Sequence, residues 1–424
     1  MKTTLEIIGK KIFGITINVT DTFWITLNIA VKLILSIIGS ILFARLAGVE
    51  YFGKYQYIFS LNSVAALLVL PGIENALINS SAKKTEGDFI LAFKKKLSLL
   101  PFYILFFLVL NFAIFINTKS FELLLSFFII SILSGYITIF DYHLSYFIGK
   151  REYKKLFVCT LMTSFSSITV VLSYFYFSKF IFHTHVPIYA LIAVPLLWNA
   201  CIYTYIFIYI RKRLIYRSTF SDDFLPYAKN LSYISIVKNI QTNIDEFLVG
   251  TFFKYESLTF YSIGKKIFMN SLYIWSIALN YLQPRLVGKS IQEAYGYFKK
   301  YLKVYWLIIP GIIVFCLLLP SIIKILYGKE FLGASNYAQL FMVIIVISIP
   351  AFYLEVYYKA NQLYRILYIG RMVDTLSLIS FVIFVYLFHA YGIILNRIIA
   401  TFILSLILIL IFLRKMKQQS TQKI

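Results

Sequence analysis

The sequence predicts an all-α integral membrane protein, with about twelve transmembrane helices in two six-helix lobes related by parallel pseudo-symmetry around a central cavity. Composition is the first reason, because the chain is 60% hydrophobic and 14% charged with a mean hydropathy of +0.81, which ordinary soluble domains do not show. The second reason is that membrane-length apolar runs follow one another along the chain. The third is that one of these segments recurs in the second half.

The first half of the chain contains six apolar runs of roughly 20 residues, the length that crosses the hydrocarbon core as a helix. They cover residues 24–46, 55–78, 97–116, 121–148, 156–177 and 187–210. Residues 1–22 combine basic and apolar side chains without a cleavage site, so we expect an amphipathic lead-in on the cytoplasmic membrane surface.

The second half repeats this pattern, with apolar runs at residues 227–252, 258–282, 301–326, 333–358, 366–388 and 392–413. A basic and polar linker at residues 211–226 separates the two halves. We therefore expect residues 1–217 to form the N-terminal lobe, with the lead-in and helices 1–6, and residues 218–424 to form the C-terminal lobe, with helices 7–12.

Lysine and arginine concentrate in alternate connections, and such short connections stay in the cytoplasm. The connections around Lys150 and residues 211–217 are strongly basic, whereas those around Lys119 and His183 carry few charges. Both termini are therefore expected in the cytoplasm. The net charge of +23 follows from this bias and favours anionic membrane lipids. A nucleic-acid partner is disfavoured, because the basic residues are dispersed between helices and form no continuous stripe.

Residues 26–55 and 232–261 repeat one hydrophobic segment at a fixed offset. The matched polar residues are Lys32 with Lys238, Glu50 with Glu256, and Tyr55 with Tyr261. Six predicted spans separate the two copies, so both copies enter the membrane in the same direction. Paired repeats in transporters meet at a substrate site near the bilayer midplane, which predicts a transporter with a positively charged centre.

Polar side chains inside spans mark candidate binding sites, because ionisable groups in hydrocarbon cost several kcal/mol and turn toward protein or a wet cavity. The seventh span carries such residues on one helical face, and the first span repeats the arrangement more weakly. Ammonium and guanidinium groups in such a cavity suit phosphate, although a buried Lys–Asp structural network is the alternative. The expected substrate-binding residues are Lys32, Lys238, Lys265, Arg397, Asn28 and Gln241.

Four acids within predicted spans are candidates for proton or Na⁺ coupling: Asp245, Glu74, Asp141 and Asp374. Alternatively, each of them neutralises a nearby lysine or arginine. The sequence shows no hydrolytic or redox constellation, and its few histidines are scattered, so we expect neither an enzyme nor a metal site nor a bound cofactor.

Several short strings resemble the polysaccharide transporter family, the Wzx-type flippases of the MATE-like multidrug/oligosaccharidyl-lipid/polysaccharide exporter superfamily. FARLAG at residues 43–48 followed by FGKY at 52–55 resembles the first helix-loop-helix of that family. Residues 245–261, QPR at 283–285 and LYGKEF at 326–331 resemble its other recurrent signatures. The chain departs from the family at Val49-Glu50-Tyr51, where proline and acidic residues are frequent.

The resemblance covers essentially the whole chain and implies two six-helix bundles around a cationic cavity. It implies that the protein flips an undecaprenyl-diphosphate-linked oligosaccharide, such as an O-antigen or capsule repeat unit, across the bacterial plasma (inner) membrane by alternating access. A polysaccharide polymerase and a chain-length regulator would be its partners.

Two other functions remain open. An ion-coupled multidrug antiporter of the same superfamily would have a cavity dominated by acids, whereas lysines dominate here. A membrane polysaccharide polymerase would carry a large external loop with clustered catalytic residues, and none of the predicted external connections is long enough.

Overall fold

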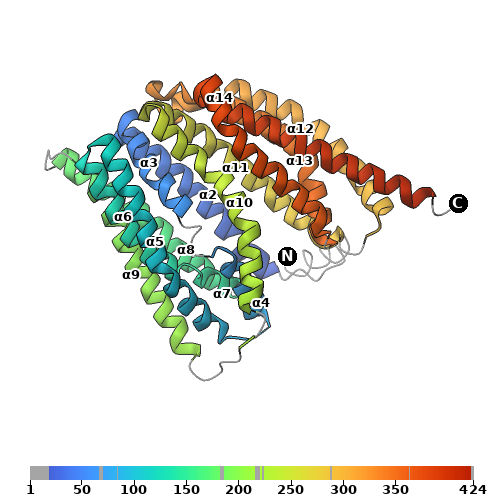
Figure 1. The fold of residues 1–424 in the computed structure, drawn as a ribbon, viewed down its shortest axis with the longest axis horizontal. Coiled ribbons are helices and arrows are strands. Elements are labelled where there is room, and N and C mark those ends of the chain that lie inside the picture. The colour runs from blue at the N-terminus through green and yellow to red at the C-terminus, as the bar shows by residue number, and fades with distance from the viewer. Residues whose placement is uncertain are drawn as a thin grey trace. The chain divides into compact units, whose positions relative to one another are not determined.

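A computed structural model describes residues 19–65, 70–83, 85–181, 186–214, 220–221, 224–286, 289–361 and 363–421, which hold helices and no strand. Most of the expected lead-in at residues 1–22 lies outside these ranges. The α-helices are α2 Val19–Ala47, α3 Val49–Ala65, α4 Gly72–Ala82, α5 Asp88–Thr118, α6 Phe121–Phe140, α7 His143–Gly149, α8 Tyr153–Tyr176, α9 Ile188–Leu214, α10 Phe224–Phe252, α11 Tyr255–Leu286, α12 Ile291–Leu326, α13 Ala334–Ala360 and α14 Tyr364–Thr421 (Figure 1). A π-helical turn, Phe177–Ile181, extends α8, and a 3-10 turn, Lys329–Phe331, follows α12.

Each predicted span overlaps a helix, which confirms the all-α membrane class. In the described ranges, eight helices are long and apolar enough to cross a membrane. Many large apolar side chains on them face outward, including Phe102 on α5, which is 69% exposed, and Leu307 on α12, which is 80% exposed. Exposed apolar surface of this extent indicates contact with lipid.

Three predicted spans differ in detail from the helices observed. The second span is divided between α3 and α4, which begins directly after Pro71. The fourth is interrupted between α6 and α7 at Asp141. The last two spans share α14, where Phe388 and His389 leave helical geometry and His389 has a φ of 53°. The chain reverses tightly there, because a Cβ on Gly392 would lie 1.9 Å from the Phe384 carbonyl oxygen, so only glycine fits.

The described chain divides into two compact units, Met1–Phe247 and Leu248–Ile424. This division falls inside α10, whereas the expected lobes divide between residues 217 and 218. The two six-helix lobes therefore stay a prediction.

Unit 1, Met1–Phe247, contains α2 to α9 and most of α10. Helix α2 packs on α8, and α6 packs between α5 and α9 (Figure 1). Its main core joins α4, α5, α7 and α9 through side chains such as Phe89, Phe147 and Phe207. The beginning of α10 belongs to this unit because Ser232 Oγ accepts a hydrogen bond from the backbone N–H of Gly72 at 2.9 Å.

Unit 2, Leu248–Ile424, is organised around α13, which packs against α11, α12 and α14. Its tyrosines bind carbonyl groups on neighbouring helices. The Tyr353 hydroxyl donates to the Ala294 carbonyl at 2.9 Å, and the Tyr358 hydroxyl donates to the Leu408 carbonyl at 3.2 Å. These buried hydroxyls are thereby satisfied, as an apolar environment requires.

The two copies of the sequence repeat adopt the same helix-turn-helix structure. Helices α3 and α11 begin at Val49 and Tyr255, which are separated by the offset of the repeat. Glu50 and Glu256 both lie in the first turn of these helices. The first copy turns at Gly48, whose φ of 79° favours glycine. The repeat is therefore a repeat of structure as well as of sequence.

A buried ionic cluster as candidate functional site

Lys96 on α5 is the centre of a buried ionic cluster in unit 1, and it is only 2% exposed. Its Nζ donates to Oδ1 of Asp141 at 2.6 Å and to the carbonyl oxygen of Thr138 at 2.9 Å. Oε1 of Glu74 lies 4.0 Å from the same Nζ. The ammonium group also lies 5.5 Å from the centre of the Tyr142 ring. A buried ammonium group is tolerated only when it is paired and hydrogen-bonded, and Lys96 is both.

The end of α6 explains why the cluster forms at this place. The last carbonyl groups of a helix have no partner within the helix. Here the carbonyl of Thr138 accepts from Lys96, and the carbonyl of Phe140 lies 2.9 Å from Nδ1 of His143. The partial negative charge of a helix C-terminus also favours a nearby cation. The fourth predicted span is therefore interrupted where polar side chains bind the end of α6.

Glu74 connects the cluster to the exposed surface of unit 1. Glu74 lies in the first turn of α4, and its side chain is 46% exposed. Lys32 is exposed on α2. The cluster thus brings together two of the residues expected from the sequence, Glu74 and Asp141, around a lysine that was not expected. Their roles in binding and coupling stay predictions.

His143 is the second residue of the cluster that the sequence did not single out. It is fully buried, and its Nε2 has no hydrogen-bond partner among the described residues. Its ring packs on Tyr203 with 4.9 Å between ring centres. A neutral imidazole that donates from Nδ1 to the Phe140 carbonyl fits this arrangement. Across the described ranges, no group of three or more histidine, cysteine or acidic side chains is placed to hold a metal ion.

The sequence did contain a signal for Lys96. It belongs to a basic stretch, residues 94–96, that precedes the third predicted span and lies near the beginning of α5. The two lysines that precede it are exposed, whereas Lys96 shares the helical spacing of Phe89, Ala92 and Tyr103, all of which are buried. Helical periodicity therefore places Lys96 on the core face of α5.

The other expected residues of unit 1 lie on α2 and α10. Asn28 is half-buried, and its Oδ1 has no hydrogen-bond partner among the described residues. Asp245 is fully buried, and its Oδ1 accepts from the backbone N–H of Glu246 at 2.9 Å. Lys238 and Gln241 belong to α10, but their side chains lie outside the described residues.

The expected residues of unit 2 are all buried. Lys265 on α11 is 5% exposed, and Arg397 and Asp374 on α14 are 9% and 7% exposed. Asn396, beside Arg397, joins the two halves of α14, because its Nδ2 donates to the Ser377 carbonyl at 2.7 Å. Unit 2 therefore buries two cations and an acid.

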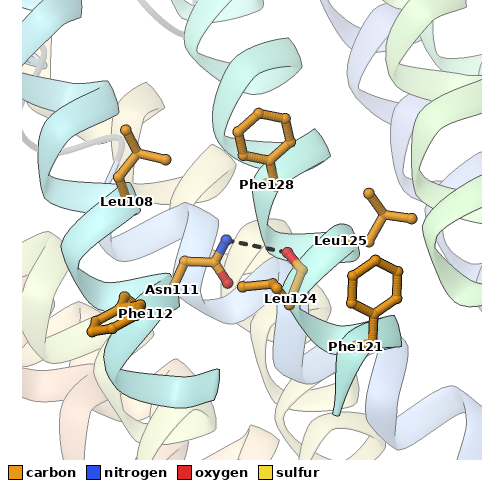
Figure 2. A pocket seen from close by; sticks show the side chains of 7 residues that line it. All are labelled: Leu108, Asn111, Phe112, Phe121, Leu124, Leu125 and Phe128. Carbon is orange, nitrogen blue, oxygen red and sulfur yellow. Dashed lines mark hydrogen bonds between the residues drawn. The ribbon is translucent and has the colours of Figure 1, made fainter. Parts of the chain in front are cut away.

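A groove on unit 1 lies between α5 and α6 (Figure 2). Nδ2 of Asn111 donates to the Leu124 carbonyl at 3.1 Å and so links the two helices. Phe112 and Phe121 at its rim are 64% and 69% exposed. The lining offers hydrocarbon and no charged group, so it suits lipid chains and not phosphate; it consists of Leu108, Asn111, Phe112, Phe121, Leu124, Leu125 and Phe128.

A family model described as polysaccharide biosynthesis protein matches residues 42–336 of this chain. No curated protein sequence matches the chain.

The fold is similar to those of solved transporters. The lipid II flippase MurJ in an inward closed conformation is 15% identical, with a TM-score of 0.67 over 93% of this chain and 87% of that chain. An outward-facing multidrug resistance MATE family transporter of the MOP superfamily is 11% identical, with a TM-score of 0.63 over 93% of this chain and 94% of that one. A MOP superfamily transporter from Pyrococcus furiosus, described with a binding pocket of reverse polarity, is 10% identical. Its TM-score is 0.57 over 93% of this chain and 94% of that chain. At these identities the likeness establishes the fold and not the substrate.

Proposed function

Because the chain belongs to the family of polysaccharide biosynthesis proteins, we propose that it flips an undecaprenyl-diphosphate-linked oligosaccharide across a membrane by alternating access. One joint observation carries this proposal. The family model matches residues 42–336 of a multi-pass membrane chain whose fold is that of a lipid II flippase and of MATE transporters. A polysaccharide built on a lipid carrier needs its charged carrier to cross the membrane, and a transporter fold supplies that step.

The cations expected from the sequence supply the proposed diphosphate site. The exposed Lys32 on α2 and its repeat partner Lys238 on α10 bind the phosphoryl oxygens. Two buried cations of unit 2, Lys265 and Arg397, add positive charge, and Asn28 and Gln241 offer uncharged polar contacts. The polyprenyl chain stays in lipid, which hydrocarbon surfaces such as the groove between α5 and α6 suit.

Ion coupling is a further part of the proposal. The candidates are Asp245, Glu74, Asp141 and Asp374, and the coupled ion is a proton or Na⁺. Asp245→Asn should abolish gradient-dependent transport while substrate binding persists, because the variant removes only the ionisable group. Transport that is unchanged when the gradient is collapsed would exclude coupling for the whole protein.

The proposed setting is the bacterial plasma membrane, with both termini in the cytoplasm. A polymerase acting on the outer leaflet and a chain-length regulator would then use the translocated glycan. Basic connections of the chain support this orientation through their bias toward the cytoplasm.

An ion-coupled multidrug antiporter is the second candidate, because the MATE transporter matches with a TM-score similar to that of the flippase. Such an antiporter binds cationic drugs through acids. In the ionic cluster the acids already face Lys96, so they are less suited to bind a cationic drug. The membrane polymerase loses support, since the solved structures reported above are a flippase and transporters.

Complementation of a flippase-deleted strain tests the proposal. Lys32→Arg and Lys238→Arg should retain partial export, because phosphate pairing needs a cation and tolerates some change in geometry. Lys32→Ala and Lys238→Ala should each weaken substrate binding roughly tenfold to a hundredfold, since a charge-assisted contact contributes about 1.5–3 kcal/mol. Lys94→Ala, an exposed lysine on α5, is the matched control and should export normally. Full surface glycan in the Lys32→Ala, Lys238→Ala double variant would refute the cationic-site mechanism.

A further inference from the structure

The four acids proposed for ion coupling differ in their access to water and in their partners. Asp245 and Asp374 are buried and so shielded from bulk water. Asp141 is partly exposed, but its Oδ1 is held by the ammonium group of Lys96 at 2.6 Å. The side chain of Glu74 is 46% exposed, and within the described residues its carboxylate accepts no hydrogen bond. Glu74 is therefore the acid of this group that an ion from water reaches most directly.

Lys96 does not neutralise Glu74 and Asp141 together. An ammonium group has three N–H donors. One donates to Asp141 at 2.6 Å and another to the Thr138 carbonyl at 2.9 Å, whereas Oε1 of Glu74 lies 4.0 Å from Nζ, outside hydrogen-bond distance. One positive charge thus faces two carboxylates, and carboxylates that share a site oppose each other's ionisation. The cluster therefore has place for one more positive charge, at Glu74.

The elements packed against α4 bring no second ion pair to Glu74 within the described residues. Helix α4 packs on α5 and α7, and it meets α10 through uncharged groups. No ion pair joins Lys32 on α2 to Glu74 in this part of the chain. Lys96 is therefore the ammonium group that Glu74 shares with Asp141. The titratable and charged groups around this acid are Lys96, Asp141, Tyr142, His143, Tyr203 and Tyr227.

We propose that Glu74 is a coupling site of its own and that the ion it takes up is a proton. The inference rests on the proposed function, because it assigns the ion coupling proposed above to one residue and one ion. With the proton bound, Glu74 is a neutral carboxylic acid, and Lys96 with Asp141 forms a neutral pair. A Na⁺ ion on the same carboxylate would lie beside the ammonium group of Lys96, which repels it.

Release of the proton affects the end of α6 through Lys96. The ionised Glu74 attracts the ammonium group and competes for it with Asp141 and the Thr138 carbonyl, both of which belong to the end of α6. These two bonds hold the break between α6 and α7. The proton on Glu74 thereby determines how firmly Lys96 holds this break, which links ion binding to a place where the helix can move.

Infrared spectroscopy of the full protein in lipid nanodiscs tests the inference, because a carboxylic acid has a C=O band that a carboxylate lacks. Lowering the pH from about 8 to about 5.5 stays above the range in which free glutamate titrates. The wild type should gain one carboxylic acid band over this range, and Glu74→Gln should lack it. Glu50→Gln is the matched control and should keep the band, because Glu50 is 72% exposed and pairs with Lys54. Replacing KCl by NaCl should leave the band unchanged.

Asp141→Asn tests the competition for Lys96. In this variant Glu74 is the one carboxylate left to Lys96 among the described residues, so it should stay ionised and the band should disappear. Selective ¹³C labelling of glutamate carboxyl groups should shift the wild-type band, which separates Glu74 from Asp141. Glu74→Asp keeps the acid and should show the band at an altered frequency, which provides a test even where Glu74→Gln does not fold.

A band that persists in Glu74→Gln or in Asp141→Asn, that shifts with labelled aspartate, or that Na⁺ suppresses overturns the inference. None of these results contradicts the flippase proposal, which surface glycan in the flippase-deleted strain decides. Failure of the wild type to restore surface glycan refutes the flippase proposal, whereas a glutamate band that Glu74→Gln removes still shows a proton site at Glu74.

Discussion

Asp141 ends helix α6 and holds the ammonium group of Lys96 at 2.6 Å, although the two residues are 45 positions apart in the sequence. The pair joins α5 to the break between α6 and α7. Because Lys96 is buried and also donates to a free helix carbonyl, the pair fixes the place at which α6 stops.

Removing Lys96 should destabilise unit 1. Lys96→Met leaves Asp141 without its partner, and loss of one member of a buried pair typically costs 3–5 kcal/mol. Asp141 is 30% exposed, so we expect a smaller loss of about 2 kcal/mol. Thermal unfolding of the variant and the wild type in detergent measures this loss of stability. Lys96→Met combined with Asp141→Leu should recover part of the loss, because no charge is left unpaired. A double variant less stable than Lys96→Met would contradict this account.

Gly72 should resist substitution, because α4 and α10 approach closely at this residue. A Cβ on Gly72 would lie 2.3 Å from the Ala228 carbonyl oxygen and 2.4 Å from the Ser232 nitrogen, both of which are backbone atoms. Gly72→Ala should therefore lower stability by about 1–3 kcal/mol, as overpacking does. Gly296→Ala on α12 is the control, since nothing lies within 4 Å of its Cβ, and it should be neutral or stabilising. Equal melting temperatures for the two variants would count against the close approach.

The beginning of α12 should depend on its capping box. Ser290 Oγ accepts from the Glu293 backbone N–H at 3.3 Å, and Oε2 of Glu293 accepts from the Ser290 backbone N–H at 3.0 Å. Ser290→Ala removes the first of these bonds, and lost caps cost about 1 kcal/mol. Hydrogen exchange should accelerate in the first turn of α12 and stay unchanged in α13. Ser290→Asp, which can still cap the helix, should exchange like the wild type.

Topology can be tested with reporter tags. Tags at Lys2, near Lys154 and at Lys423 should report the cytoplasm, and a tag near His183 should report the outside, because basic connections stay in the cytoplasm. Lys154 lies in the first turn of α8, whereas the other three positions fall outside the described residues. An external tag at Lys154 would reverse the orientation of unit 1.

The sequence by itself determined the membrane class and the positions of the helices. Spans can be read locally, because about 30 Å of hydrocarbon requires roughly 20 apolar residues and no solvent is available to satisfy exposed backbone. The repeat was also visible, and α3 and α11 begin at equivalent positions of its two copies. The break between the last two predicted spans was visible as well, and it lies at Phe388 and His389.

Only the tertiary structure decided which charges are buried and with what partner. Lys94 and Lys96 both look like residues of one basic connection, yet one is exposed and the other is 2% exposed. The difference depends on α6, whose free carbonyl and terminal Asp141 reach Lys96 from a distant part of the chain. The energy of such an ion pair depends on the distance between charged groups on different helices, and the sequence of one helix does not specify that distance. For the same reason the sequence identified Glu74 as a polar residue within a span, while its placement near Lys96 came from the packing of α4 against α5.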